Sequence, residues 1–240
     1  MRILIIIAAL IIPLASLAST GEDATPQYRT IEVKASKIST IERKVRDAAV
    51  KVLTNFGHGS GSLVRHRGVQ FVITAQHVAS GEIGLPYMVQ KEKEIKSGIL
   101  IYSNPSNDIA VLWIDSEFET IDPMRFSLTR EIPNVGEEIT YSGYPSSHEI
   151  MTYRGYIAGF ENIEGSGRQI LLHTFGWFGC SGSVVFNSRG DIVGVLWGID
   201  SLNGIIIESL IWVSPIQNLD FELALSEFCK STEQNARACR

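Results

Sequence analysis

Short apolar segments separated by turn residues run through most of this 240-residue chain, and they restrict the folds that it can form. Segments of about four to eight residues, rich in aliphatic and aromatic side chains and bounded by Gly, Pro, Asn or Asp, are typical of β-strands joined by hairpins. We expect strands over residues 50–56, 63–64, 69–74, 87–90, 99–103, 109–114, 152–159, 169–173, 184–186, 192–197, 205–207 and 210–215, and an alternating strand between a turn and a Gly-Tyr-Pro stop within 135–145. Many short strands at this spacing predict an all-β sandwich or barrel.

Helical spacing occurs only near the two ends of this strand-rich region. Apolar residues at 41, 45, 48, 49 and 52 predict a short amphipathic helix that runs into the first strand. Apolar residues at 216, 219, 223 and 228 predict a closing C-terminal helix over residues 216–228.

Composition and charge limit the class of protein. With 45% hydrophobic residues, the chain can bury a core as one large all-β domain or as two small ones. The net charge of −5 and the pI near 5.6 imply no basic face, which argues against nucleic acid as a partner.

The N-terminus has the pattern of a secretory signal peptide. Residues 3–12 are an unbroken apolar run behind Arg2, and small residues at 16 and 18 favour cleavage after Ala18. The alternative is an uncleaved membrane anchor, but residues 3–18 number only 16, short of the ~20 that span a bilayer, and Pro13 interrupts them. We therefore expect a secreted or periplasmic protein with no membrane span after cleavage.

The turn at residues 179–183 (GCSGS) has the features of a site for a serine nucleophile. A nucleophilic serine needs an exposed hydroxyl on a tight turn, with backbone N–H groups facing the same reacting atom, and flanking glycines permit such a turn. An ordinary surface turn is the alternative. Cys180 is a rival nucleophile, but Ser181 occupies the position before the glycine that the motif requires.

Two upstream residues complete a catalytic set with Ser181. His77 follows the strand at 69–74, and Asp108 stands at the start of the strand at 109–114; the rival carboxylates Asp115 and Asp122 read as exposed turn residues. In such a set the histidine is the general base, the aspartate orients it, and the N–H groups of Gly179 and Ser181 bind the oxyanion.

These residues resemble the trypsin/chymotrypsin superfamily of serine proteases. The motifs TAQH (74–77), NDIA (107–110) and GCSG (179–182) occur in the order His, Asp, Ser. The segments GSGS (59–62), VGE (135–137) and GYP (143–145) resemble the bacterial Deg (high-temperature-requirement) branch. The resemblance implies two six-stranded antiparallel β-barrels, over residues 45–126 and 127–228, with His77 and Asp108 from the first and Ser181 from the second.

The chain departs from the family pattern at three points. Ser183 stands where the family usually has a second glycine, a change that leaves the turn intact. Cys180 replaces the aspartate that animal members use on activation, so activation of the trypsin type is not expected. No PDZ domain, which Deg proteases usually carry, is expected; the remaining segments are an N-terminal arm (19–44) and a C-terminal tail (229–240).

The resemblance also implies a specificity pocket, whose candidate residues are Phe175, Gly176, Trp197, Gly198 and Glu208. No histidine lies in residues 194–198, which disfavours specificity for Glu or Gln. Glu208 could attract a basic side chain, with an outward-facing solvated glutamate as the alternative. His173 could reach the mouth of the pocket or be structural.

We therefore expect an exported serine endopeptidase that hydrolyses peptide bonds of a protein or peptide substrate through an acyl-enzyme. The alternatives are a non-catalytic binding protein on the same fold and an exported esterase with the same triad; a helix directly after Ser181 would favour the esterase. No cofactor is expected, and no metal, because the spacing of His58, His66 and His77 suits no common ligand pattern. Cys229 and Cys239 either pair or remain free, and the oligomeric state is left open.

Overall fold

The structure is a computed structural model that describes residues 38–128, 131–146, 148–231 and 239. The expected signal peptide, with its cleavage site after Ala18, lies outside the described residues. No helix in the described part of the chain is both long and apolar enough to cross a membrane.

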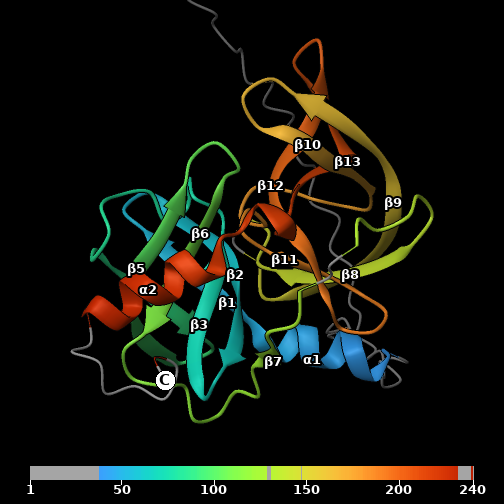
Figure 1. Cartoon of the computed structure of the whole chain (residues 1–240). Helices are drawn as coiled ribbons and strands as arrows, with labels where there is room; N and C mark the ends of the chain where they lie inside the picture. The colour runs from blue at the N-terminus through green and yellow to red at the C-terminus, as the bar shows by residue number, and fades with distance from the viewer. Residues whose placement is uncertain (1–37, 129–130, 147, 232–238, 240) are drawn as a thin grey trace, which may run out of the picture. The chain divides into compact units, whose positions relative to one another are not determined.

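Six antiparallel strands close the first barrel, on the left in Figure 1. They are β1 (Ala49–Thr54), β2 (Gly57–His66), β3 (Val69–Thr74), β4 (Pro86–Lys91), β5 (Glu94–Asn104) and β6 (Ile109–Ile114). The ring runs β1-β4-β5-β6-β3-β2, and the pairing of β1 with β2 closes it. The two-residue strand β7 (Met124–Arg125), which the sequence did not predict, extends the sheet parallel to β2.

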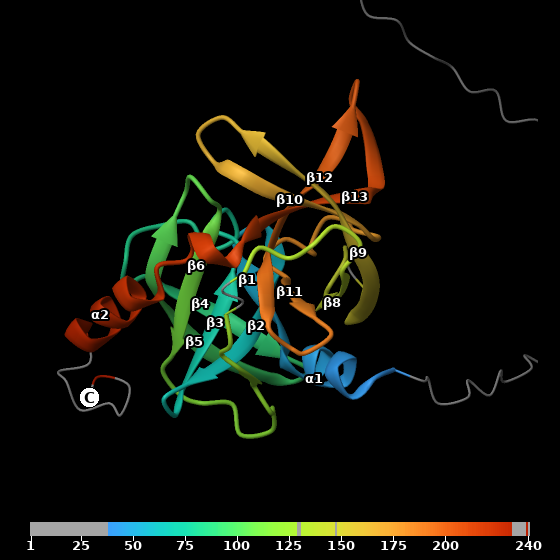
Figure 2. The ribbon, with the colours of Figure 1, turned by 45° about the vertical axis from the view of Figure 1, so that its right-hand side comes forward.

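A second closed barrel of six antiparallel strands follows. Its strands are β8 (Glu138–Gly143), β9 (Met151–Ile163), β10 (Gly167–His173), β11 (Val184–Asn187), β12 (Ile192–Leu202) and β13 (Ile205–Pro215). The ring runs β10-β13-β12-β11-β8-β9, and Figure 2 shows it from a second side. The expected fold of two six-stranded antiparallel barrels is confirmed, whereas the exact barrel boundaries, 45–126 and 127–228, remain predictions.

β13 is continuous where the sequence predicted two strands. Glu208 and Ser209 lie between the two expected strands, where the register with β12 skips from Ile211 to Ile207. Their carbonyl oxygens instead accept hydrogen bonds from the N–H groups of Gly176 and Thr174, at 2.9 and 3.2 Å. Backbone bonds of this kind do not depend on apolar side chains, which is why the hydropathy pattern missed the continuity.

The helix α1 (Thr40–Ala48) runs into β1 as expected. Ser39 and Glu42 form a capping box in which each side chain accepts a hydrogen bond from the other residue's backbone N–H, at 3.2 and 2.6 Å. The buried carboxylate of Glu42 also pairs with the guanidinium of Arg154 on β9. This ion pair joins α1 to the second barrel.

The C-terminal helix begins later than the sequence predicted. A 3₁₀ turn, η1 (Ile216–Asn218), comes first, and α2 spans Phe221–Ser231. The carboxylate of Asp220 accepts a hydrogen bond from the N–H of Leu223 at 3.0 Å, which starts a new helix there. α2 lies against the first barrel in Figures 1 and 2, where the ring of Phe228 packs 5.6 Å from Phe71. A disulfide then joins Cys229 to Cys239.

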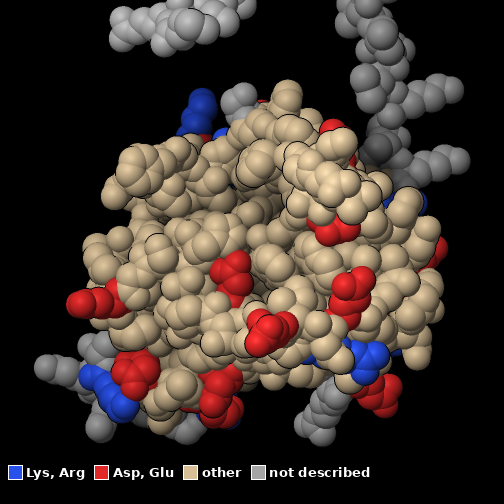
Figure 3. Space-filling model, turned by 90° about the horizontal axis from the view of Figure 1, so that it is seen from above, with Lys and Arg blue, Asp and Glu red and all other residues tan. Residues whose placement is uncertain are grey.

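Charge is distributed unevenly over the face seen from above. Asp and Glu are scattered across it, while Lys and Arg appear only near its margin (Figure 3).

Candidate active site

His77 and Asp108 lie together at one end of the first barrel. His77 comes three residues after β3 and Asp108 directly precedes β6, and these two strands pair antiparallel with Thr74 opposite Ala110. The imidazole Nδ1 lies 2.6 Å from Asp108 Oδ2, and the backbone N–H of His77 donates to Oδ1 at 2.7 Å. Because a carboxylate only accepts, Nδ1 is the donor in this contact, which leaves Nε2 as the ring nitrogen that can act as a base.

The loop that presents Asp108 is held by side chains that the sequence analysis did not single out. Asp108 has a left-handed backbone, with φ of 50°. The N–H of Asn107 donates to Asn104 Oδ1 at 3.2 Å, and the Asn107 Oδ1 accepts from Asn218 Nδ2 at 2.6 Å. Asn218 belongs to η1, so the segment that follows the second barrel helps to position Asp108. No local sequence signal pairs residues this far apart in the chain.

Ser181 lies on a tight turn that packs closely against the turn of His77. Gly179 and Gly182 have φ of 93° and 89°, which residues with a Cβ rarely adopt. A Cβ on Gly182 would lie 2.1 Å from Ser60 O and 2.9 Å from Ala75 N, so only glycine permits this approach. Ser181 itself is partly exposed.

Gly59 shows how near the two turns come to each other. A Cβ on Gly59 would lie 3.0 Å from the carbonyl oxygen of Ser181 and 2.4 Å from a side-chain methyl of Val78, the residue after His77. Among the described residues no hydrogen bond joins Ser181 Oγ to His77; such bonds are often long without substrate and tighten when it binds.

Two backbone N–H groups beside Ser181 are oriented but unpaired. In the described part of the chain, neither Gly179 N–H nor Ser181 N–H donates a hydrogen bond. The carbonyl of each of these two peptide groups is held: Phe178 O accepts from Ser146 N–H at 2.6 Å, and Cys180 O accepts from Ser183 N–H at 2.9 Å. Fixed carbonyls leave the two N–H groups pre-oriented, as an oxyanion-binding site requires.

Cys180 points away from this chemistry. Its side chain is fully buried in the core of the second barrel, and burial raises the pKa of its thiol. A protonated, inaccessible thiol is a poor nucleophile. The structure therefore favours Ser181 over Cys180 as the reactive residue.

The candidate pocket residues fall into two groups. Phe175 and Glu208 line a cavity of about 280 Å³ together with Met151, Tyr153 and Trp177. Trp197 and Gly198, in contrast, are not among the described residues that line it. The indole N–H of Trp197 donates to Gln169 Oε1 at 3.1 Å, and Gly198 pairs with Trp212.

Gly176 is not among the described residues that line this cavity, and it packs against the core. A Cβ on Gly176 would come within 2.3 Å of Ile211 Cδ1, so Gly176 allows the chain to pass over a buried isoleucine. Its N–H donates to Glu208 O at 2.9 Å.

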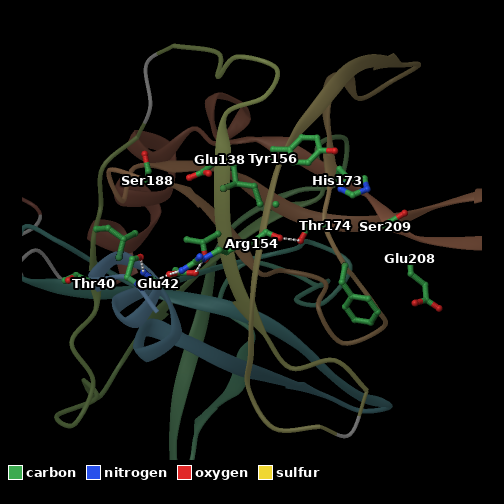
Figure 4. Close-up of a pocket in the computed structure, with 16 residues that line it drawn as sticks. Thr40, Glu42, Glu138, Arg154, Tyr156, His173, Thr174, Ser188, Glu208 and Ser209 are labelled. Carbon is green, nitrogen blue, oxygen red and sulfur yellow. Dashed lines mark hydrogen bonds and ion pairs between the residues drawn. The ribbon is translucent and has the colours of Figure 1, made fainter. Parts of the chain in front are cut away.

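A larger cavity of about 1030 Å³ lies between the start of α1 and strands β8, β9, β10 and β13, and Phe175 and Glu208 line it as well. Figure 4 shows it with the ion pair between Glu42 and Arg154. His173 lies here, with its ring stacked on Tyr156 at 5.0 Å. None of His77, Asp108 and Ser181 lines this cavity.

Of the other three histidines, His148 lines the cavity of about 280 Å³, and two are engaged elsewhere. His58 Nε2 lies 2.9 Å from Tyr144 O, and the ring of His66 packs edge-on between Phe126 and Phe221. Among the described residues, no three His, Cys, Asp or Glu side chains are grouped so that they could hold a metal ion.

Comparisons with known proteins bear on the family and the fold of the chain. Residues 59–195, more than half of the chain, match the family described as trypsin-like peptidase domain. The serine endoprotease DegS of Escherichia coli, from strain K12 and from strain O157:H7, is 27% identical over 210 residues. That match covers 80% of this chain but only 57% of DegS.

Solved structures show the same fold at lower identity. An active form of the Rv3671c protease from M. tuberculosis is 17% identical with a TM-score of 0.63, covering 77% of this chain and 83% of that one. An inactive mutant form is 16% identical with a TM-score of 0.60, covering 80% of this chain and 92% of that one. At these identities the likeness concerns the fold alone.

Proposed function

Because this chain belongs to the trypsin-like peptidase family, we propose that it is a serine endopeptidase that cleaves peptide bonds through an acyl-enzyme. The catalytic residues in this proposal are His77, Asp108 and Ser181. The observation that carries it is the pairing of both Asp108 oxygens with His77 beside a serine turn whose two N–H groups are free.

Each group has a role that follows from its surroundings. His77 Nε2 takes the proton of Ser181 as the hydroxyl attacks the substrate carbonyl, and then passes it to the leaving amine. Asp108 keeps the proton on Nδ1 and stabilises the imidazolium that forms. The N–H groups of Gly179 and Ser181 bind the negative oxygen, and water hydrolyses the acyl-enzyme in the second half of the reaction.

A protein or peptide is the proposed substrate, and export is the proposed route. DegS is named a serine endoprotease, which supports cleavage within a polypeptide. Strand β11 begins two residues after Gly182, so no helix follows the nucleophile, which disfavours the esterase alternative. The apolar N-terminal run and the small residues before Ser19 support export. Phe175 and Glu208, which line the cavity of about 280 Å³, are the residues proposed to contact substrate.

The test compares the mature chain from Ser19 with its Ser181→Ala variant. We expect a fluorophosphonate probe to label the wild type, unfolded casein to be cleaved, and both activities to disappear in the variant. Labelling without casein cleavage would indicate an esterase or a narrow specificity. If the wild type neither labels nor cleaves, the alternative of a non-catalytic binding protein on the same fold is favoured.

The mass of the exported protein tests whether the signal peptide is cleaved after Ala18.

A further inference from the structure

Ser60 of the first barrel contacts the turn that carries Ser181 in the second barrel. We propose that Ser60 is a positioning residue that fixes the oxyanion-binding N–H groups of Gly179 and Ser181. This inference rests on the proposed function, and it assigns a role to a side chain that does not touch the substrate.

Ser60 makes three hydrogen bonds across the two barrels. Its backbone N–H donates to Ser181 O at 2.7 Å, and its hydroxyl donates to Gly179 O at 2.7 Å. The hydroxyl also accepts from the backbone N–H of Tyr144 at 3.0 Å. Ser60 is fully buried, so water does not compete for these bonds.

The bond to Gly179 O matters because of the peptide group to which that oxygen belongs. The Gly179–Cys180 peptide lies between the two peptides whose N–H groups are unpaired. Its own N–H is also held, since Cys180 N–H donates to Trp177 O at 3.0 Å. Rotation about ψ of Gly179 or φ of Cys180 would change the angle between the two flanking peptide planes, and therefore the relative orientation of their N–H groups.

Gly179 is the residue most able to permit that rotation. It lacks a Cβ and has φ of 93°, so other backbone conformations are accessible to it. Without the Ser60 hydroxyl, the carbonyl of Gly179 loses the partner that holds the peptide in place. Phe178 O and Cys180 O keep their backbone partners, so the fold of the turn does not depend on this one bond.

Ser60 also connects the oxyanion-binding turn to the strand that leads to His77. Its carbonyl oxygen accepts a hydrogen bond from Thr74 Oγ1 at 2.7 Å, and Thr74 is the last residue of β3. A single buried residue thus has bonds to the turn of Ser181 and to the strand before His77.

The test uses Ser60→Ala with Ser62→Ala as a matched control. Ser62 lies on the same strand and is equally buried, but its hydroxyl has no hydrogen-bond partner among the described residues. We would measure the rate constant of fluorophosphonate labelling, kcat and KM on a chromogenic peptide ester, and the melting temperature. Loss of one oxyanion donor costs about 100- to 1000-fold in rate, so a misoriented pair should cost roughly 10- to 100-fold.

We expect Ser60→Ala to lower the labelling rate and kcat by roughly 10- to 100-fold with little change in KM, and Ser62→Ala to stay within about twofold of the wild type. Labelling of Ser60→Ala at the wild-type rate, or an equal loss in Ser62→Ala, would overturn the role of Ser60.

If Ser60→Ala does not fold, Ser60→Cys replaces it, because a thiol has similar volume and is a weak donor. Reduced labelling of folded Ser60→Cys then supports the role, and wild-type labelling overturns it. A wild type that does not label at all would overturn the proposed function itself, and this role with it.

Discussion

Asp108 holds the imidazole of His77 with both carboxylate oxygens, which makes the proton position on His77 sensitive to one substitution. In Asp108→Asn the amide can donate to Nδ1, which moves the ring proton to Nε2 and removes the base. We expect the rate of fluorophosphonate labelling at pH 7 to fall by about 10³- to 10⁴-fold while the melting temperature changes little.

Asp115→Asn is the control for this substitution. Asp115 is exposed and directly follows β6, the strand that Asp108 directly precedes, so its variant should label at the wild-type rate. If Asp108→Asn labels as fast as Asp115→Asn, Asp108 does not orient His77.

The same residues show what could be predicted at this scale. His77, Asp108 and Ser181 stand beside turns that follow or precede apolar strands, so local sequence was sufficient to propose them. The bond from Asn218 to Asn107 and the bond from Ser60 to Gly179 join residues 111 and 119 positions apart. Contacts of this kind depend on how two barrels meet, and one sequence contains no signal for that.

Helix α1 is attached to the second barrel by the pairing of Glu42 with Arg154. Hydrogen bonds from the Arg154 guanidinium are the main cause that lowers the pKa of the Glu42 carboxyl to about 2. Because the pKa of Glu42 is lower in the folded state, its ionised carboxylate stabilises the fold at pH values above the unfolded pKa of 4.5. This stabilisation is lost as the pH falls from 4.5 toward 2. Because Arg154 is 65% exposed, solvent screens the pair. We expect Glu42→Gln to lower the free energy of unfolding at pH 7 by about 1–2 kcal/mol.

Urea unfolding of wild type and Glu42→Gln between pH 7 and pH 2 checks this expectation. The difference should be constant down to about pH 4.5 and shrink below it. Asp47→Asn, at an exposed position on the same helix, is the control and should show a smaller effect. A difference that persists unchanged at pH 2 would mean that packing, rather than the ionised carboxylate, accounts for the loss.

Helix boundaries were harder to predict than helix existence. Apolar spacing placed one helix over residues 216–228, yet Asp220 caps a new helix and leaves a 3₁₀ turn before it. Spacing describes which side chains face a core, and it does not describe which carboxylate accepts a backbone N–H. The side of the molecule that α2 covers was not predictable either, because apolar spacing does not show which barrel a helix packs against.

At the level of the whole molecule, one buried cluster extends across both barrels, and the second barrel has a further cluster of its own. Val184 and Phe186 of β11 belong to the same buried cluster as Phe71 and Leu112 of the first barrel, and α2 contributes Phe228 to it. The sequence predicted two barrels but not this shared core, because strand periodicity shows that a side chain is buried and not what it contacts. A core that spans both barrels should make them unfold together.

We therefore expect a single thermal transition. For roughly 200 residues unfolding near 60 °C as one unit, the calorimetric enthalpy is about 140 kcal/mol, and a van't Hoff enthalpy of the same size is expected. In Trp113→Phe the remaining tryptophans, at 177, 197 and 212, lie in the second half of the chain, so their fluorescence should follow the same transition as the calorimeter. A van't Hoff enthalpy near half the calorimetric value, or a fluorescence midpoint displaced from the calorimetric one, would instead mean that each barrel unfolds alone. Independent unfolding would also weaken the role of Ser60, because its bonds to Gly179 and Ser181 require both barrels to be in place.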